Sequence, residues 1–170
     1  MPANPLHALR VNARELLRVP GSSRRIDEQV DASDLGVPDP RITGPIGVAL
    51  DAVSSIDGIV VSGDITIPWT TSCRRCLTDV TGTAIVDVDE IYQDDVSDDE
   101  AFPIEGDQID LAPPVREYVL IELPDGPLCR EDCGGICPVC GIDRNRATCE
   151  CDTTVRDDRW AALDDLRLDE

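Results

Sequence analysis

The sequence contains no lysine, a single histidine and only two tryptophans, two tyrosines and one phenylalanine among its 170 residues. Few large rings limit what a hydrophobic core can contribute, so metal cross-links would help to stabilise such a fold. The histidine, His7, lies close to the N-terminus, where chains are often poorly ordered, and is therefore a poor candidate for a general base. A G-x-S-x-G elbow, a P-loop and a dinucleotide-binding glycine pattern are also missing, and no carboxylate pair sits in an apolar context. These absences predict a protein that is not an enzyme.

Long apolar runs are absent as well. No stretch has the length that a membrane-spanning helix needs, and the start of the chain, MPANPLHALR, lacks the apolar centre of a signal peptide. We therefore expect a cytoplasmic protein whose thiols stay reduced. In that compartment the even number of cysteines, eight, predicts metal ligands rather than disulfides.

The net charge of −20 is unevenly distributed. Residues 1–30 carry five arginines against three acids, whereas the remainder carries ten arginines against 32 acids. So acidic a body repels phosphate backbones, which disfavours broad nucleic-acid binding and favours a basic partner. The alternative is that the charge only maintains solubility.

Alternating apolar and polar residues predict three strands, over about 46–52, 59–67 and 84–89. Asp57-Gly58 is a hairpin signal between the first two. Residues 31–45, rich in proline and glycine, and residues 93–100, rich in acids, read as exposed loops.

Three helices are expected. Asn12 and Glu15 have capping-box spacing, which predicts a short helix over 13–18. Asp110 would cap a second helix opening at Pro113-Pro114. Its apolar face would consist of Leu111, Val115, Val119 and Leu123. Asp157 or Asp158 would cap a third, with Trp160, Leu163 and Leu166 on one side, packed on the core or kept for a partner.

The chain length predicts one domain with appended parts. We expect an α+β fold over residues 1–126, with an antiparallel sheet, a packing helix and a cysteine-bearing hairpin. A cysteine-rich segment over 127–155 would pack on it, and a C-terminal amphipathic helix would occupy 156–170.

The eight cysteines form four close pairs: Cys73 and Cys76, Cys129 and Cys133, Cys137 and Cys140, Cys149 and Cys151. Two pairs can complete a tetrahedral thiolate cage around one ion, so four pairs supply two cages. The most specific element is the CPxCG knuckle, Cys137-Pro138-Val139-Cys140-Gly141. Spacing favours joining the first two pairs in one site and the last two in the other, because the second loop is short and closes cheaply. A ribbon-like pairing of Cys73 and Cys76 with Cys137 and Cys140 stays open.

Both cages would hold four thiolates and no water, which is typical of structural zinc rather than catalytic zinc. Disulfides and an iron–sulfur centre are the alternatives. Five arginines lie close to the cysteines in sequence: Arg74, Arg75, Arg130, Arg144 and Arg146. We expect them to offset the negative charge of the cages, although they could equally form a patch that contacts RNA phosphates.

The ordered cysteines and their neighbours resemble the YceD family. The shared residues are Cys73-Arg74-Arg75-Cys76-Leu77, Leu111 through Leu123-Pro124, Pro127-Leu128-Cys129, Asp132 through Gly141, and Cys149-Glu150-Cys151. The resemblance runs from about Val11 to the last expected helix. The family commonly has leucine in place of Ile136 and Asn-Leu-Asn near Asp143-Arg144-Asn145, and neither departure touches a ligand. The lysine-free, acid-rich composition suggests an actinobacterial-type member.

The resemblance implies a role in accumulation of large-subunit ribosomal RNA. Genes of the family typically neighbour the gene of a small basic zinc-ribbon protein of the large subunit. This chain would then be a non-enzymatic assembly factor with two structural Zn²⁺ ions that binds a basic ribosomal protein or a precursor particle. The alternatives are an RNA-binding zinc protein that uses its N-terminal and knuckle arginines, and a sensor whose thiols release zinc on oxidation.

Overall fold

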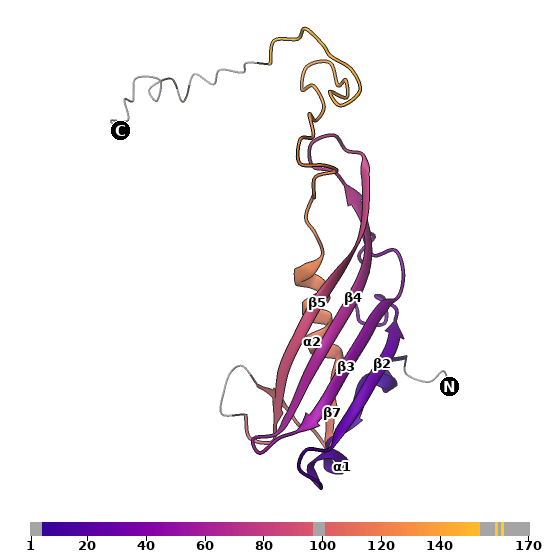
Figure 1. The fold of residues 1–170 in the computed structure, drawn as a ribbon, viewed down its shortest axis with the longest axis vertical. Coiled ribbons are helices and arrows are strands. Elements are labelled where there is room, and N and C mark those ends of the chain that lie inside the picture. The colour runs from indigo at the N-terminus through magenta and orange to yellow at the C-terminus, as the bar shows by residue number, and fades with distance from the viewer. Residues whose placement is uncertain (1–4, 97–100, 154–158, 160, 162–170) are drawn as a thin grey trace.

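A five-stranded sheet forms the body of the protein, in the order β2-β3-β4-β5-β6 (Figure 1). The computed structural model describes residues 5–96, 101–153, 159 and 161. The long strands are β2 (Ser23–Val30), β3 (Ile46–Ser54), β4 (Ile59–Ser72) and β5 (Asp79–Gln93), and adjacent long strands are antiparallel. The short β6 (Phe102–Pro103) pairs parallel to β5. The α+β fold and the mostly antiparallel sheet are as the sequence predicts.

One face of this sheet carries the core, because alternate side chains of each strand point to the same side. The pattern is clearest in β3 and β4, whose inward residues are almost fully buried. The inward side chains of the four long strands include Ile26, Val30, Ile46, Val48, Leu50, Ile59, Val61, Ile65, Ile67, Val86, Val88 and Tyr92.

The helix α2 (Ala112–Glu122) packs against this face (Figure 1). All four residues of its predicted apolar face, from Leu111 to Leu123, are buried. Asp110 accepts a hydrogen bond from the backbone N–H of Ala112 at 3.0 Å, although the residue at the cap position itself is Leu111. The Tyr92 hydroxyl donates to the carbonyl of Asp110 at 2.7 Å, and this contact joins the start of the helix to the sheet.

The N-terminal segment adds three short elements: the 3-10 helix η1 (Pro5–Leu9), β1 (Arg10–Asn12) and α1 (Ala13–Leu17). β1 pairs with β7 (Gln108–Asp110) in a separate two-stranded sheet. As expected from the capping box, Asn12 accepts a hydrogen bond from the N–H of Glu15.

The hairpin of β4 and β5 extends beyond the rest of the sheet. Pairing of β3 with β4 stops at Thr66, whereas β4 and β5 stay paired as far as Ser72 and Asp79. Trp69 stands opposite Gly82, and its ring fills the space that a side chain at Gly82 would need. The turn between β4 and β5, which contains Cys73 and Cys76, therefore lies beyond the part of the sheet that β3 covers (Figure 1).

Several elements differ from the sequence prediction. β2 was not expected, nor were β1, β6, β7 and η1, whose short length gives no periodic pattern. The predicted 31–45 loop is confirmed as lacking long elements, yet it buries Leu35 and Val37.

The expected C-terminal helix lies outside the described residues apart from positions 159 and 161, as do residues 97–100 of the acidic loop. Among the described helices, none combines the length and apolarity that crossing a bilayer requires.

Candidate metal centres

The turn between β4 and β5 forms the first cysteine knuckle. The N–H of Cys73 donates to the carbonyl of Thr78 at 2.8 Å, and the N–H of Leu77 donates to the carbonyl of Cys73 at 2.9 Å. Leu77 has a φ of 60°, which completes the fold of the turn. Both Cys73 and Cys76 are buried, and their sulfurs point toward the segment that follows α2.

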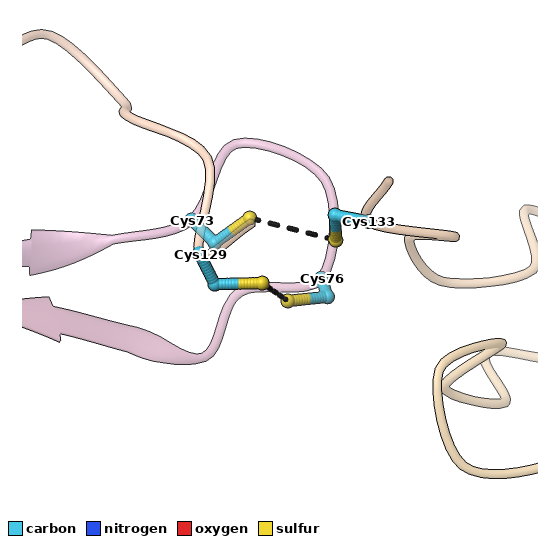
Figure 2. A group of neighbouring side chains, drawn as sticks. All are labelled: Cys73, Cys76, Cys129 and Cys133. Atoms are coloured by element: carbon cyan, nitrogen blue, oxygen red, sulfur yellow. Dashed lines mark hydrogen bonds between the residues drawn. The ribbon is translucent and has the colours of Figure 1, made fainter. Parts of the chain in front are cut away.

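That segment supplies two further thiols, from Cys129 and Cys133 (Figure 2). The Sγ atoms of Cys73 and Cys133 are 3.8 Å apart, and those of Cys76 and Cys129 are 3.6 Å apart. All four sulfurs lie within 4.8 Å of one another. The backbone supports the approach, since the N–H of Arg74 donates to the carbonyl of Pro127 and the N–H of Ile136 to the carbonyl of Arg75.

The CPxCG segment forms a second knuckle with the same backbone pattern. The N–H of Cys137 donates to the carbonyl of Ile142, and the N–H of Gly141 donates to the carbonyl of Cys137, both at 2.8 Å. Gly141 has a φ of 73° and stands where Leu77 stands in the first knuckle. The sulfurs of Cys137 and Cys140 lie within 4.8 Å of those of Cys149 and Cys151. The structure thus groups the eight cysteines as the spacing favours and does not adopt the ribbon-like pairing.

The two groups differ in exposure. In the first, Cys73, Cys76 and Cys133 are at most 8% exposed, and only Cys129 is open to solvent. In the second, Cys137 alone is buried. The first group also has an apolar surround that includes Val80 and Leu128.

Backbone N–H groups favour the ionised form of the first cysteine of each knuckle. The N–H of Cys76 lowers the pKa of the Cys73 thiol to about 6, and the N–H of Cys140 lowers that of Cys137 to about 6. Neighbouring thiols have the opposite effect on the pKa of one later cysteine in each group. The neighbouring thiol of Cys133 raises the pKa of Cys129 to about 12, and that of Cys140 raises the pKa of Cys151 to about 12. A divalent cation among the sulfurs would remove this opposition, because it favours every thiolate.

The donor set fits a four-coordinate thiophilic ion. Tetrahedral Zn²⁺ with Zn–S bonds of about 2.3 Å requires sulfurs about 3.8 Å apart. The sulfur separations of 3.6 and 3.8 Å in the first group agree with that requirement. The cysteines are free thiols in both groups.

Asn145 supports the first group from outside, a role not predicted from the sequence. Its side-chain N–H donates to Sγ of Cys133 at 3.5 Å and to the carboxylate of Asp143 at 2.8 Å. Its side-chain oxygen accepts from the N–H of Gly134 at 2.8 Å and from Arg130 at 2.9 Å. Thr78, whose hydroxyl lies 3.4 Å from Sγ of Cys76, was missed as well. The Asp143-Arg144-Asn145 turn was the available signal, because Asp and Asn often bond to nearby backbone.

The knuckle arginines are mostly engaged within the cysteine segment. Arg75 donates to the carbonyl of Cys133, Arg130 pairs with Asp132, and Arg146 pairs with Asp143. Two of these contacts are with carboxylates and one is with a backbone carbonyl, so the expected offset of the negative charge of the cages stays a prediction. The side chains of Arg74 and Arg144 form no ion pair or hydrogen bond within the described part of the chain.

The family model described as "Large ribosomal RNA subunit accumulation protein YceD" matches residues 61–167, a range that contains all eight cysteines. The chain belongs to the YceD family. The matched range also contains β5, α2 and most of β4, so the extended hairpin and both cysteine groups lie within the shared region of YceD proteins.

This YceD protein is similar to several bacterial proteins. An uncharacterised protein of Mycobacterium tuberculosis is 38% identical over 93 residues, which cover 51% of this chain and 45% of that protein. The chain thus matches about half the length of this relative. The uncharacterised protein YlbN of Bacillus subtilis is 28% identical over 165 residues, 89% of this chain and 92% of YlbN.

The name of one plant relative refers to accumulation of the large ribosomal RNA subunit. The large ribosomal RNA subunit accumulation protein YCED homolog 1, chloroplastic, of Arabidopsis thaliana is 32% identical over 66 residues, 39% of this chain and 21% of that protein. The search of solved structures returned no match.

Proposed function

We propose that this YceD protein is a non-enzymatic factor in biogenesis of the large ribosomal subunit, that two structural Zn²⁺ ions organise it, and that it binds a basic ribosomal protein. The observation that carries the proposal is the family match over the region that contains both cysteine groups. The family name supplies the link to large-subunit ribosomal RNA.

Zinc is supported by the chemistry of the ligands. Each group offers four thiolates and no other donor, which suits a soft or borderline ion such as Zn²⁺ better than Mg²⁺ or Ca²⁺. In the first site, Zn²⁺ would join the end of the β4–β5 hairpin to the chain that leaves α2, so the ion would act as a cross-link. Four protein ligands leave no position for water, which is the arrangement of structural zinc.

The sheet face that points away from the core supports binding of a basic protein. Five acids on neighbouring strands share this face, which we call the acidic face: Asp27, Asp51, Asp64, Asp87 and Asp89. Within the described residues, one arginine, Arg25, forms an ion pair on it, with Asp51. Asp64 stands directly opposite Asp87, an arrangement of like charges that destabilises a sheet and that a cationic partner would relieve.

Aliphatic side chains extend the acidic face at both ends of the acids. Ile85 is 69% exposed, and Val60 and Ile91 lie half-buried opposite each other. A surface that combines carboxylates with aliphatic groups suits a lysine- and arginine-rich protein, because charge steers the encounter and apolar contact slows dissociation.

Depletion of the protein from its host tests the cellular role. We expect large-subunit ribosomal RNA to fall relative to small-subunit RNA, and a tagged copy to recover a basic ribosomal protein or a precursor particle at moderate salt. Normal rRNA ratios on depletion would contradict the ribosomal role. Recovery of neither ribosomal protein nor particle would contradict the partner.

Metal analysis of the purified protein tests the zinc proposal. We expect two zinc ions per chain and none in a variant that lacks both knuckles. Iron and inorganic sulfide in place of zinc would contradict the assignment.

A further inference from the structure

An arginine-lined groove lies at the end of the molecule that holds η1, β1 and α1. It measures about 790 Å³, which is within the range of a small-ligand site. Its wall is formed by α1, β1 and the first residues of β2, and Ser22 and Ser23 lie where the chain passes from α1 to β2. We call it the N-terminal groove.

The charge of the N-terminal groove is opposite to that of the chain. Arg10, Arg18 and Arg24 line it together with His7, and Glu15 is its only acid among the described residues. The chain as a whole has 35 acids against 15 arginines, so a lining drawn at random would be acidic. Distant carboxylates weaken this local field little, because salt screens charges beyond about 8 Å at physiological ionic strength.

Two of these arginines are available to a ligand. Arg10 pairs with Asp110, and the neighbouring Arg14 and Arg25 pair with Asp107 and Asp51. Arg18 and Arg24 have no ion pair within the described residues, and both are exposed.

The remaining lining suits a sugar–phosphate chain. The hydroxyl of Ser23 and the amide of Gln108 are side chains of the kind that bind phosphate and ribose oxygens. Val11 and Leu16 give the groove an apolar floor, and Val19 adds an exposed aliphatic rim. The side chains of Asn12 and Ser22 are already engaged, with Glu15 and with the carbonyl of Leu16.

We infer that the N-terminal groove binds single-stranded RNA through its phosphates, with Arg18 and Arg24 as the principal contacts. The inference rests on the proposed role in large-subunit biogenesis for the choice of RNA over other polyanions. It places RNA at the end of the molecule opposite the knuckles and on a different surface from the acidic face, so protein and RNA could be held together.

Fluorescence anisotropy of labelled oligouridylate with the full-length, zinc-loaded protein tests the inference. At low salt we expect binding by the wild type and a loss of at least about tenfold in Arg18→Ala/Arg24→Ala, because two phosphate contacts disappear. The slope of log affinity against log salt should fall by about 1.4 in the double variant, since each phosphate contact on a single strand contributes about 0.7.

Two controls use arginines that lie outside the groove. Arg116→Ala, on the exposed side of α2, makes the same kind of charge change and should leave affinity and slope close to those of the wild type. Arg74→Ala/Arg144→Ala tests the knuckle patch as a rival RNA site. Thermal melting checks that every variant folds, which we expect because Arg18 and Arg24 are exposed and unpaired in the described structure.

Three outcomes would overturn the inference: no RNA binding by the wild type at low salt, equal loss in Arg116→Ala, or loss only in Arg74→Ala/Arg144→Ala. Competition by polyglutamate as effective as that by RNA would also overturn it, because the groove would then bind carboxylates. If depletion still lowers large-subunit rRNA while RNA binding is absent, the groove assignment fails and the proposed function stands.

Discussion

Leu77 and Gly141 occupy equivalent positions in two knuckles whose backbone hydrogen bonds match. Both have positive φ, 60° and 73°, a conformation that costs a residue with a Cβ about 1–2 kcal/mol and costs glycine almost nothing. The first knuckle therefore carries strain that the second avoids. The Leu77 side chain is 62% exposed, so burial offsets little of that cost.

Replacement of Gly141 should lower stability, whereas replacement of Leu77 should not. Gly141→Ala should destabilise the second knuckle by about 1 kcal/mol, because no atom lies within 4 Å of the added Cβ and strain is the only cost. Leu77→Gly should leave stability unchanged or raise it slightly, since relief of strain is offset by the entropy of glycine. Zinc competition with a chromophoric chelator measures both effects. Weaker zinc binding in Leu77→Gly than in Gly141→Ala would contradict the comparison.

Asn145 should matter to the first metal site although it is not a ligand. Asn145→Ala removes a hydrogen bond to Sγ of Cys133 and leaves the N–H of Gly134 and the side chain of Arg130 without their acceptor. Loss of such supporting contacts typically costs 10- to 100-fold in metal affinity. We expect that range for one of the two zinc ions by chelator competition, with the second ion unaffected. Thr148→Ala, an exposed change in the same segment, serves as control.

At the level of elements, the sequence predicts the strands and the helix that have a regular apolar pattern. It does not predict a strand that forms because a neighbouring strand offers it a paired edge. β3, β4 and the buried face of α2 follow from periodicity, because one face of each packs on the core. β2 contains Ile26 and Val30 as buried residues among charged neighbours, and it becomes a strand because β3 offers it a paired edge. The cysteine grouping followed from spacing, whereas the contacts of Asn145 depend on a turn whose position relative to Cys133 no local pattern specifies.

The two metal sites should contribute unequally to stability. The first joins residues about 55 positions apart in sequence, between the hairpin and the segment after α2, whereas the second closes a short local loop, and longer closures restrict the unfolded chain more. Cys76→Ser should lose one zinc and lower the melting temperature of the whole domain markedly. Cys149→Ser should also lose one zinc but change the melting of the sheet little.

Metal content by mass spectrometry and melting by circular dichroism at β-sheet wavelengths check this pair of variants. The wild type treated with a mild chelator is the reference, and its more exposed second site should lose zinc first. Equal melting temperatures for the two variants would contradict a cross-linking role for the first site.

At the level of the whole molecule, charge is segregated: the acidic face lies on the outer side of the sheet and the N-terminal groove lies beside its β2 edge. A chain of net charge −20 has no uniform attraction for RNA, so a local cationic groove and a broad acidic face allow two ligands of opposite charge on one scaffold. From the sequence, a basic partner and RNA are alternatives. Under the two proposals, the basic partner and RNA would occupy separate surfaces.

The acidic face offers a test in which stability and binding change in opposite directions. Asp64→Asn/Asp87→Asn removes a directly opposed pair of like charges, so the free energy of unfolding should rise by about 0.2–1 kcal/mol. The same change removes two carboxylates from the surface proposed for a basic ribosomal protein, so that protein should be recovered less well in a pulldown at moderate salt. Asp34→Asn, in the exposed 31–45 loop, is the matched control and should alter neither quantity. Unchanged recovery from the double variant would place the basic partner elsewhere. A loss of recovery could not be attributed to a folding defect, because the variant is expected to be more stable than the wild type.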